Sequence, residues 1–415
     1  MNMNKIPSLR FSGYSEEWET KRLSDIVDRV TRKNTELQST LPLTISSQYG
    51  LVDQNSFFNK RIASQNLSNY YLVKNGEFAY NKSSSDGHPF GAVKRLDLYE
   101  MGVLSTLYIV FALKDGANID SDYLASYFDT TNWYKQVSER ASEGARNHGL
   151  LNISADDFLS ISMTLPRNIH EQELIGDYLT KLDDLIALHT QKFEKLSQVR
   201  LSLLDRLFIH GNSISPEVRF GDFKGEWGKR SLKSIIVPYT DYLPTPTDGY
   251  TRLGIRSHMK GTFYEYVAPS RQLGEKRLQR VKRDNFIVNI VFAWEHAIAV
   301  TTEEDEGKLV SHRFPQFSFN EGMYPRFFHY ALSDERFRHH LWLASPSGAG
   351  RNKTLRIDEM LEYELRVPEY EEQKKIADFL TSLDNLIELY DYRITKLQNI
   401  KAACLQGMFV QEDAQ

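Results

Sequence analysis

The chain repeats part of its own sequence after about 200 residues. The segment PSLRFSGYSEEWETKRLSDIV begins at Pro7, and PEVRFGDFKGEWGKRSLKSII begins at Pro216. The two segments share a proline, an Arg-Phe pair, a Glu-Trp pair and a leucine at a constant offset of 209 residues. This period is far longer than the roughly 20–50 residues of a solenoid unit. The repeat therefore predicts a duplicated domain rather than a repeat array.

Two further pairs of segments follow in the same order. LPRNIHEQELIGDYLTKLDDLIAL begins at Leu165 and VPEYEEQKKIADFLTSLDNLIEL at Val367, and a short GARN at 144–147 precedes the first as GAGRN at 348–352 precedes the second. The intervening regions, about 27–143 and 237–347, show no obvious similarity. One interpretation is an old duplication with general drift. Because the divergence is confined to these regions, we favour a constant frame that carries two different recognition surfaces.

The third repeated segment predicts a long helix in each half. Pro166 and Pro368 end the preceding strands, and acidic residues suit the helix N-terminus that follows. Apolar residues then recur at alternating spacings of four and three for more than four heptads, which is typical of a coiled coil. Arg200 and Lys401 interrupt the two seams at the same repeat position, so we expect them to fix the register. The seam positions on which the prediction rests are Leu182, Ile186, Leu196, Arg200, Leu383, Ile387, Leu397 and Lys401.

We expect the two helices to pair with each other in antiparallel orientation, although each could instead pack on its own domain. The first seam would span roughly 50 Å at about 1.5 Å per residue. At about 3.4 Å per base pair of duplex DNA, such a spacer covers roughly 15 base pairs. Inserting one heptad in the first helix is then expected to change the spacing.

The remaining sequence predicts mixed α/β domains. A length of 415 residues with 41% hydrophobic residues suits two or three domains with sizeable cores. Strands are expected at 71–80, 104–113, 286–294 and 316–319, and helices at 121–139 and 325–343. The predicted organisation is 1–165 as a first domain, 166–212 as a helix, 213–366 as a second domain and 367–415 as a second helix. The expected fold class is α+β, with the two domains in a pseudo-two-fold arrangement.

Composition also limits the class of protein. The single cysteine, Cys404, excludes an internal disulfide framework and a cysteine-based metal cluster. No apolar run reaches the roughly 18 residues of a membrane span, and MNMNKIPSLR has no apolar signal region, so we expect a cytoplasmic protein. The net charge of −4 arises mostly in the helical segments, which carry −1 and −4, whereas the domains carry −2 and +3. The charge therefore does not argue against a nucleic-acid partner.

The sequence contains no catalytic signature. The P-loop, the GxGxxG fingerprint, the Asn-Pro-Pro-aromatic tetrapeptide typical of base amino-methyltransferases and the GxSxG elbow are all absent. Glu306 and Lys308 have the spacing of a nuclease carboxylate and lysine, but they lie in EEDEGK, which favours a solvated turn. The histidines lack metal-site spacing. We therefore expect a chain that binds rather than catalyses.

The duplicated frame resembles the specificity subunits of type I restriction-modification systems. The resemblance rests on PxxRFxxxxxEWxxxxL at 7–23 and 216–232, on the GARN and GAGRN elements, and on PxxxEQxxIxxxLxxLDxLI with its heptads. YNKSSSDGHPFG at 80–91 and NIVFAWEHAIAV at 289–300 also look like parts of target recognition domains of that family. The motifs are individually loose, but their duplicated order is specific and covers essentially the whole chain.

The resemblance implies a non-catalytic subunit that directs DNA modification and restriction. Each target recognition domain would read one half of a split double-stranded DNA site, and the helices would set the unread gap and dock two methyltransferase (modification) subunits. Those partners would bind S-adenosylmethionine and methylate adenine, and a restriction subunit would use ATP and Mg to translocate and cut. The alternatives are a stand-alone DNA methyltransferase or nuclease, and a coiled-coil scaffold without DNA affinity.

We expect the DNA contacts to come from polar loops of the two domains, because Arg reads guanine and Asn reads adenine in the major groove. The basic run from 271 to 283, preceded by aromatic residues, fits a phosphate-contacting face. Arg146–Asn147 and Arg351–Asn352 lie in the repeated frame, so a backbone or structural role is favoured for them. The predicted DNA-binding residues are Asn81, Lys82, Ser83, Ser84, His88, Lys94, Arg146, Asn147, Arg252, Arg256, His258, Arg271, Lys276, Arg277, Arg351 and Asn352.

Overall fold

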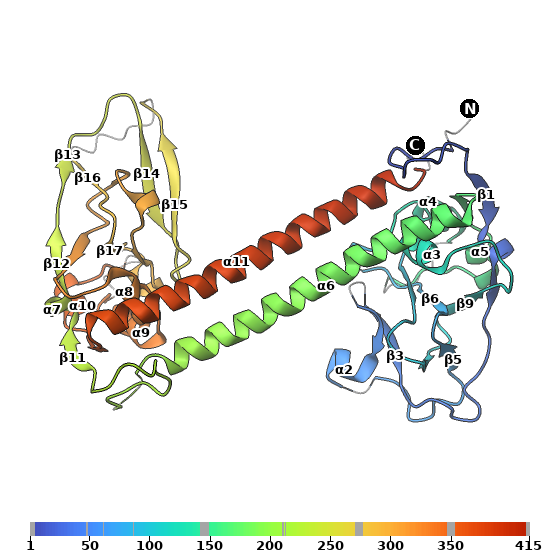
Figure 1. Ribbon diagram of the computed structural model, residues 1–415, viewed down its shortest axis with the longest axis horizontal. Helices are drawn as coiled ribbons and strands as arrows, with labels where there is room; N and C mark the ends of the chain where they lie inside the picture. Colours follow the sequence, from blue (N-terminus) through green and yellow to red (C-terminus); the bar gives the residue numbers. More distant parts are fainter. Residues whose placement is uncertain are drawn as a thin grey trace. The chain divides into compact units, whose positions relative to one another are not determined.

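The computed structural model divides the chain into two compact units, residues 1–191 with 391–415 and residues 192–390. It describes residues 5–46, 49–60, 62–85, 87–141, 149–209, 211, 213–269, 277–346 and 353–411. Both long helices, α6 (Ile169–Arg206) and α11 (Tyr370–Gly407), have 38 residues, and each begins in one unit and ends in the other (Figure 1). Each unit therefore contains the start of one long helix and the end of the other.

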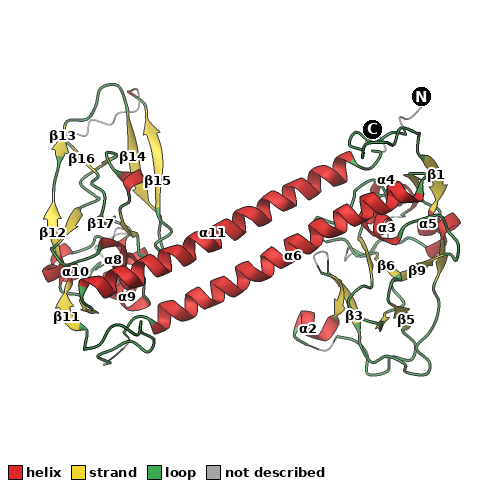
Figure 2. Ribbon diagram, in the orientation of Figure 1, coloured by secondary structure: helices red, strands yellow, loops and turns green. Residues whose placement is uncertain are grey.

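The first unit combines short strands with short helices (Figure 2). Its strands are β1 (Glu19–Arg22), β2 (Val27–Arg29), β3 (Leu43–Ser46), β4 (Gly50–Asp53), β5 (Tyr71–Lys74), β6 (Phe78–Asn81), β7 (Ala92–Arg95), β8 (Met101–Leu104), β9 (Ile109–Leu113) and β10 (Ser162–Leu165). Its helices besides α6 are α1 (Leu23–Ile26), α2 (Gln54–Phe58), α3 (Ser121–Phe128), α4 (Tyr134–Arg140) and α5 (Ala155–Leu159).

The second unit has the same mixture of elements. Its strands are β11 (Gly228–Ser231), β12 (Ile236–Tyr239), β13 (Tyr242–Leu243), β14 (Tyr250–Ile255), β15 (Thr262–Val267), β16 (Leu278–Arg280), β17 (Asn285–Val288), β18 (Ile298–Val300), β19 (Leu309–Val310), β20 (Gln316–Phe319) and β21 (Glu364–Val367). Its helices besides α11 are α7 (Leu232–Ile235), α8 (Pro325–Ala331), α9 (Glu335–Leu343) and α10 (Ile357–Leu361), with 3₁₀ turns η2 (Ala293–Glu295) and η3 (Glu303–Asp305).

The two units share one topology although their central sequences differ. A four-stranded antiparallel sheet has the order β2-β9-β6-β7 in the first and β12-β20-β17-β18 in the second. A second sheet has the order β13-β16-β19-β14-β15, with β14 and β19 parallel. In the first unit two small sheets, β5-β8 and β3-β4, take the corresponding places. An isolated bridge between Pro42 and Val103 joins them, and it is parallel like the β14–β19 pair. The regions without sequence similarity are therefore two versions of one fold.

Several predicted elements are shorter than expected. The strand predicted at 71–80 is two strands in different sheets, because the Asn75-Gly76 turn, with Gly76 at φ 82°, separates β5 from β6. The helix predicted at 121–139 is α3 and α4, and that predicted at 325–343 is α8 and α9. Both first helices of these pairs start where the chain offers a suitable residue: the side chain of Asp120 caps α3, and Pro325 opens α8. The predicted mixture of α and β is confirmed.

A buried ion pair joins the first repeated segment to the third in each unit. Arg10 donates from Nε and Nη2 to the carboxylate of Glu171 at 2.6 and 2.9 Å, and Arg219 does the same to Glu372 at 2.7 and 2.7 Å. Glu171 is 1% exposed and Glu372 is fully buried. In the first unit the indole nitrogen of Trp18 is a further donor to Glu171. The repeated Arg-Phe and Glu-Gln motifs are thus one structural contact.

The glutamine after each buried glutamate fixes the start of its long helix. Gln172 donates to the carbonyl of Pro166 at 2.8 Å and accepts from the backbone nitrogen of Asp120 at 2.9 Å. Gln373 repeats both contacts, with Pro368 at 2.9 Å and with Tyr324 at 2.8 Å. These bonds hold the long helix against the first helix of each pair, α3 or α8.

Each unit has a large core that includes the far end of the opposite long helix. In the first unit Met408 and Phe409, directly after α11, pack among Trp18, Tyr123 and Tyr127. In the second unit Leu207 and Ile209, after α6, join the core around Trp227. The backbone nitrogen of Leu9 donates to Gly407, and that of Val218 donates to Arg206, so the repeated first segments also bind these helix ends.

Replacing Arg10 with Met is expected to destabilise the first unit by about 3–5 kcal/mol, because Glu171 is left buried and charged without a partner. Urea unfolding followed by tryptophan fluorescence would measure this. Arg219→Met should act likewise on the second unit. Lys181→Met, which breaks a solvent-exposed pair with Asp177, is the control and should cost less than about 0.5 kcal/mol. A similar small loss of stability in all three variants would contradict the structural role of the two buried ion pairs.

Candidate nucleic-acid interface

The loop that leaves β6 in the first unit is joined to the chain that follows the GARN element. The backbone nitrogen of Leu151 donates to Lys82 at 2.9 Å, and that of Ser84 donates to Gly149 at 2.6 Å. Ser83 and Leu150 form an antiparallel bridge between these hydrogen bonds. Residues 142–148 directly precede this junction. The loop of 82–91 and the chain of 149–151, which follows the GARN element in the sequence, therefore meet at one place.

Local hydrogen bonds hold this loop in a compact shape. The side chain of Asn81 accepts from the backbone nitrogen of Ser83 at 3.0 Å, an Asx turn. Ser85 and His88 exchange two backbone hydrogen bonds, and Tyr80 donates its hydroxyl to Phe90 at 2.7 Å. Gly149 is required at the junction, since its φ is +67° and a Cβ there would lie 2.5 Å from the Ser84 hydroxyl oxygen.

The second unit repeats the junction with different side chains. The loop that leaves β17, residues 289–297, is joined to the chain after the GAGRN element because the backbone nitrogen of Leu355 donates to Ile290 at 2.9 Å. Lys353 lies over the rings of Trp294 and Trp342, with its ammonium 4.8 and 5.1 Å from their centroids. A cation is thus presented at this junction on an aromatic support.

The predicted DNA-binding residues separate into three groups. Asn81, Ser83, Ser84 and His88 lie together in the β6 loop, as described above. The other described residues engage different partners: Lys82 donates to Ile153, Lys94 to Asp129 and Arg252 to Glu265, Arg256 lies over Phe263, and His258 and Arg277 are exposed. Arg146, Asn147, Arg271, Lys276, Arg351 and Asn352 lie outside the described residues.

Sequence reasoning missed Lys353 and Lys260. Lys353 directly follows the GAGRN element, and its two tryptophan partners come from segments that the sequence does not link to it. Lys260 lies at the tip of the β14–β15 hairpin beside the predicted Arg256 and His258. The run RSHMKG was a usable signal for it, because three basic residues occur there without an acidic one.

The seam residues of the long helices make matched ion pairs in the two units. In the second unit Arg200 pairs with Asp384, which also accepts from the Tyr330 hydroxyl at 2.9 Å. In the first unit Lys401 pairs with Asp183 at 2.7 Å. Arg200 and Lys401 are equivalent in the repeat, as are the two aspartates. Each seam cation therefore binds the aspartate of the LDxLI motif on the other helix.

These pairs show that the helix segments are antiparallel within each unit, because later positions of α6 meet earlier positions of α11. The seam positions are buried or half-buried: Leu182 is 6% exposed, and Ile186, Leu196, Leu383, Ile387 and Leu397 are half-buried. The alternative in which each helix packs only on its own domain is thereby wrong. Arg200 and Lys401 lie where register-fixing residues were expected.

The ion pair in the first unit extends into the globular part. Asp129, at the end of α3, binds Lys401 at 2.9 Å and Lys94 at 2.6 Å. Burial alone would raise the pKa of Asp129, but the two ammonium groups outweigh it and the pKa is lowered. Burial raises the pKa of Asp183, which shares Lys401 and has no second lysine bound to it. Lys94 thus joins a strand of the domain to the helix pair.

A comparison with protein families identifies the chain. The family model described as "Type I restriction modification DNA specificity domain" matches residues 15–198 and 256–399. The chain belongs to this family. It is 23% identical over 399 residues to the type I restriction enzyme MjaVIII specificity subunit of Methanocaldococcus jannaschii, and the match covers 90% of this chain and 88% of the relative.

A solved specificity subunit has a similar fold. The crystal structure of the type I restriction-modification S subunit from M. genitalium matches with a TM-score of 0.60 at 13% identity, over 99% of this chain and all of the other. The HsdS subunit from Thermoanaerobacter tengcongensis matches 96% of this chain with a TM-score of 0.42 and 13% identity. The first of these similarities confirms the predicted fold class, two mixed α/β domains with long linking helices.

Specificity subunits are non-catalytic DNA-recognition proteins that bind no cofactor themselves. The stand-alone methyltransferase or nuclease is therefore excluded. The EEDEGK segment is a capped 3₁₀ turn, η3, in which Asp305 accepts from Thr302. Among the described residues, no cluster of three metal-ligating side chains occurs, and no helix has both the length and the apolar character needed to span a bilayer.

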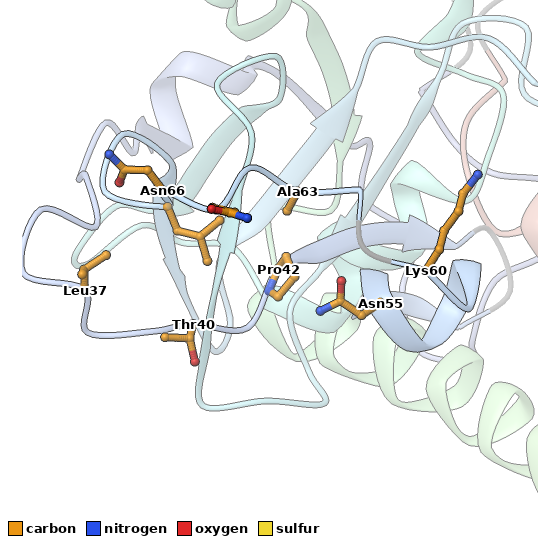
Figure 3. Close-up of a pocket in the computed structure, with 9 residues that line it drawn as sticks. Leu37, Thr40, Pro42, Asn55, Lys60, Ala63 and Asn66 are labelled. Atoms are coloured by element: carbon orange, nitrogen blue, oxygen red, sulfur yellow. The ribbon is translucent and has the colours of Figure 1, made fainter.

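The first unit also contains an open cavity of about 770 Å³ between segment 37–42 and segment 55–67 (Figure 3). Leu37, Pro42 and Leu67 provide apolar walls, and Asn55 and Asn66 add amide groups. Among the described residues that line this cavity, none is an acid or a histidine.

Acid should weaken the attachment of the helix pair to the first unit through Asp129. Because the folded-state pKa of Asp129 is lowered, its contribution to stability is complete above about pH 4 and is lost as the pH falls through the lowered value. Urea unfolding at about pH 5 and about pH 3 should show a loss for the wild type that is smaller in Asp129→Asn. An equal loss in both proteins would assign the acid sensitivity to other carboxylates.

Proposed function

We propose that this specificity subunit reads a bipartite double-stranded DNA site, with one half-site for each unit. The supporting observation is the repeated junction, at which a central-strand loop meets the GARN or GAGRN flank in the same fold with different side chains. One unit presents Asn81, Ser83, Ser84 and His88, and the other presents Lys353 on two tryptophans. A constant scaffold with exchanged polar groups suits two different half-site sequences.

We infer that the helix pair sets the unread gap between the half-sites. Each helix of 38 residues is about 57 Å long at about 1.5 Å per residue. The Arg200–Asp384 and Lys401–Asp183 pairs support a single register, and a single register suits a spacer of fixed length. A spacer of fixed length would then fix the number of base pairs between the two half-sites.

Methyltransferase subunits are proposed to dock on a second apolar stripe of the helices. Tyr178, Leu185 and Leu188 in the first unit are 39–45% exposed, and their repeat equivalents Phe379, Leu386 and Leu389 in the second are equally exposed. These positions do not belong to the seam. An apolar stripe that recurs once in each unit suits one methyltransferase on each, which is the number expected from the resemblance.

The chemistry is then assigned to the partners. The methyltransferase subunits would use S-adenosylmethionine to methylate adenine, and the restriction subunits would use ATP and Mg. The net charges of the two domain segments, −2 and +3, give this chain little attraction for phosphates. Tight binding is therefore expected only in the complex, where the partners add positive surface.

Lengthening both helices by one heptad tests this function. Seven residues inserted between Gln191 and Lys192 and seven between Tyr390 and Asp391 add about 10 Å, or about three base pairs. Methylome mapping of a host that expresses the chain with its methyltransferase should show unchanged half-sites and a gap about three base pairs longer.

An insertion in α6 alone is the control, because it displaces Arg200 from Asp384 and breaks the register. It should lower methylation instead of giving a new gap, and this expectation replaces the prediction from the sequence that one heptad added to the first helix alone changes the spacing. If the variant with both helices lengthened methylates sites with the original gap, the spacer function is refuted. Absence of any split methylated motif in the wild type would refute the proposed function as a whole.

Charges introduced into the exposed stripe should prevent docking. Leu185→Glu with Leu386→Glu is expected to reduce copurification of the methyltransferase by at least tenfold, because apolar contacts would bury a carboxylate. Gln191→Glu with Gln398→Glu adds the same charge at exposed polar positions of the same helices and should leave the complex intact. Equal recovery from both double variants would place the docking surface elsewhere.

A further inference from the structure

The tip of the β14–β15 hairpin in the second unit has a strained backbone. β14 and β15 lie side by side (Figure 1) and pair from Tyr250–Val267 to Ile255–Thr262. The backbone nitrogen of Arg256 donates to Gly261 and closes the tip. His258 and Met259, at φ 59° and 51°, are consecutive non-glycine residues in the left-handed region. Such residues are costly and persist only where surrounding contacts determine them.

The loop that leaves β17 supplies those contacts. The backbone nitrogen of His258 donates to Glu295 at 2.8 Å, and that of Met259 donates to His296 at 3.1 Å. The hydroxyl of Ser257 donates to the Glu295 carboxylate at 2.5 Å. His296 is itself buried, with its ring nitrogen 2.9 Å from the Leu332 carbonyl. The tip is therefore clamped onto the same loop that carries the Lys353 junction.

The clamped tip presents basic side chains that the hairpin stem does not neutralise. Arg252 in the stem is paired with Glu265, whereas Arg256 lies over the ring of Phe263 with its guanidinium 5.2 Å from the centroid. Lys260 is exposed, and no carboxylate pairs with it in the described part of the chain. The carboxylate of Glu295, in the loop that holds the tip, accepts from the Ser257 hydroxyl.

We propose that this tip is a preformed base-reading element of the second half-site, in which Lys260 binds the major-groove edge of a guanine. The proposal rests on the proposed function. A two-stranded ribbon fits the major groove, and guanine presents its O6 and N7 acceptors there to lysine. Base readout requires the reading side chain to extend from a backbone of fixed position. The hydrogen bonds to Glu295 and His296 fix the backbone directly before Lys260.

The test is the methylation of a DNA library by the complex of this chain with its methyltransferase. Each position of both half-sites is varied in turn. Lys260→Ala should reduce the preference for guanine at one position of the second half-site by about tenfold to hundredfold. The first half-site should be unchanged. Lys233→Ala, which removes an exposed cation of the same unit, should leave both half-sites unchanged.

A second pair of variants tests the clamp. Ser257→Ala removes the hydrogen bond to Glu295 and should weaken the guanine preference without changing thermal stability by more than a few degrees. Glu295→Gln keeps an acceptor for Ser257 and should retain the preference. A purely structural clamp would alter stability and leave the base preference intact.

Two results would overturn this inference alone. In the first, the wild type has a split motif and Lys260→Ala leaves it unchanged. In the second, Lys260→Ala lowers methylation equally on all sequences, with a salt dependence reduced by about one phosphate contact. The second result would make Lys260 a backbone contact. A wild-type complex without any split motif would overturn the proposed function together with this inference.

Discussion

The buried pairs Arg10–Glu171 and Arg219–Glu372 are the interaction on which the rest of each unit depends. Each joins the first strand region to the start of a long helix, and the neighbouring glutamine fixes that start against α3 or α8. Two charges removed from water are stable only as a complete pair. The Arg-Phe motif and the Glu-Gln motif therefore both occur in each half of the chain, because each supplies one partner of the same ion pair.

Each long helix starts at the buried ion pair of one unit and ends in the other unit. The seam cation of each helix binds the LDxLI aspartate of the other helix. Each helix ends at the core of the unit in which the other helix starts. The two ion pairs differ in their surroundings. Asp384 is supported by a tyrosine hydroxyl, whereas Lys401 also binds Asp129 and so reaches the β7 strand through Lys94.

The loops proposed as recognition surfaces differ between the two units more than the frame does. The frame repeats its residues, but the two central regions share topology without sequence similarity, since sheet order depends on apolar alternation and turns and not on particular polar side chains. Polar groups on the loops are thus free to differ. In the first unit they lie in an Asx turn beside Gly149, and in the second they lie on a strained hairpin tip and on paired tryptophans.

The sequence by itself determined the duplication, the mixed α/β class, the two long helices and their seams, because periodicity and repetition are local properties of the chain. It also located the β6 loop as a polar segment and selected Arg256 and His258 as polar loop residues. It could not show that Lys94 is held by Asp129, that Lys353 rests on Trp294 and Trp342, or that Glu295 clamps Ser257. Those contacts join residues far apart in the chain, so only the tertiary structure decided which cations are neutralised and which remain available to a ligand.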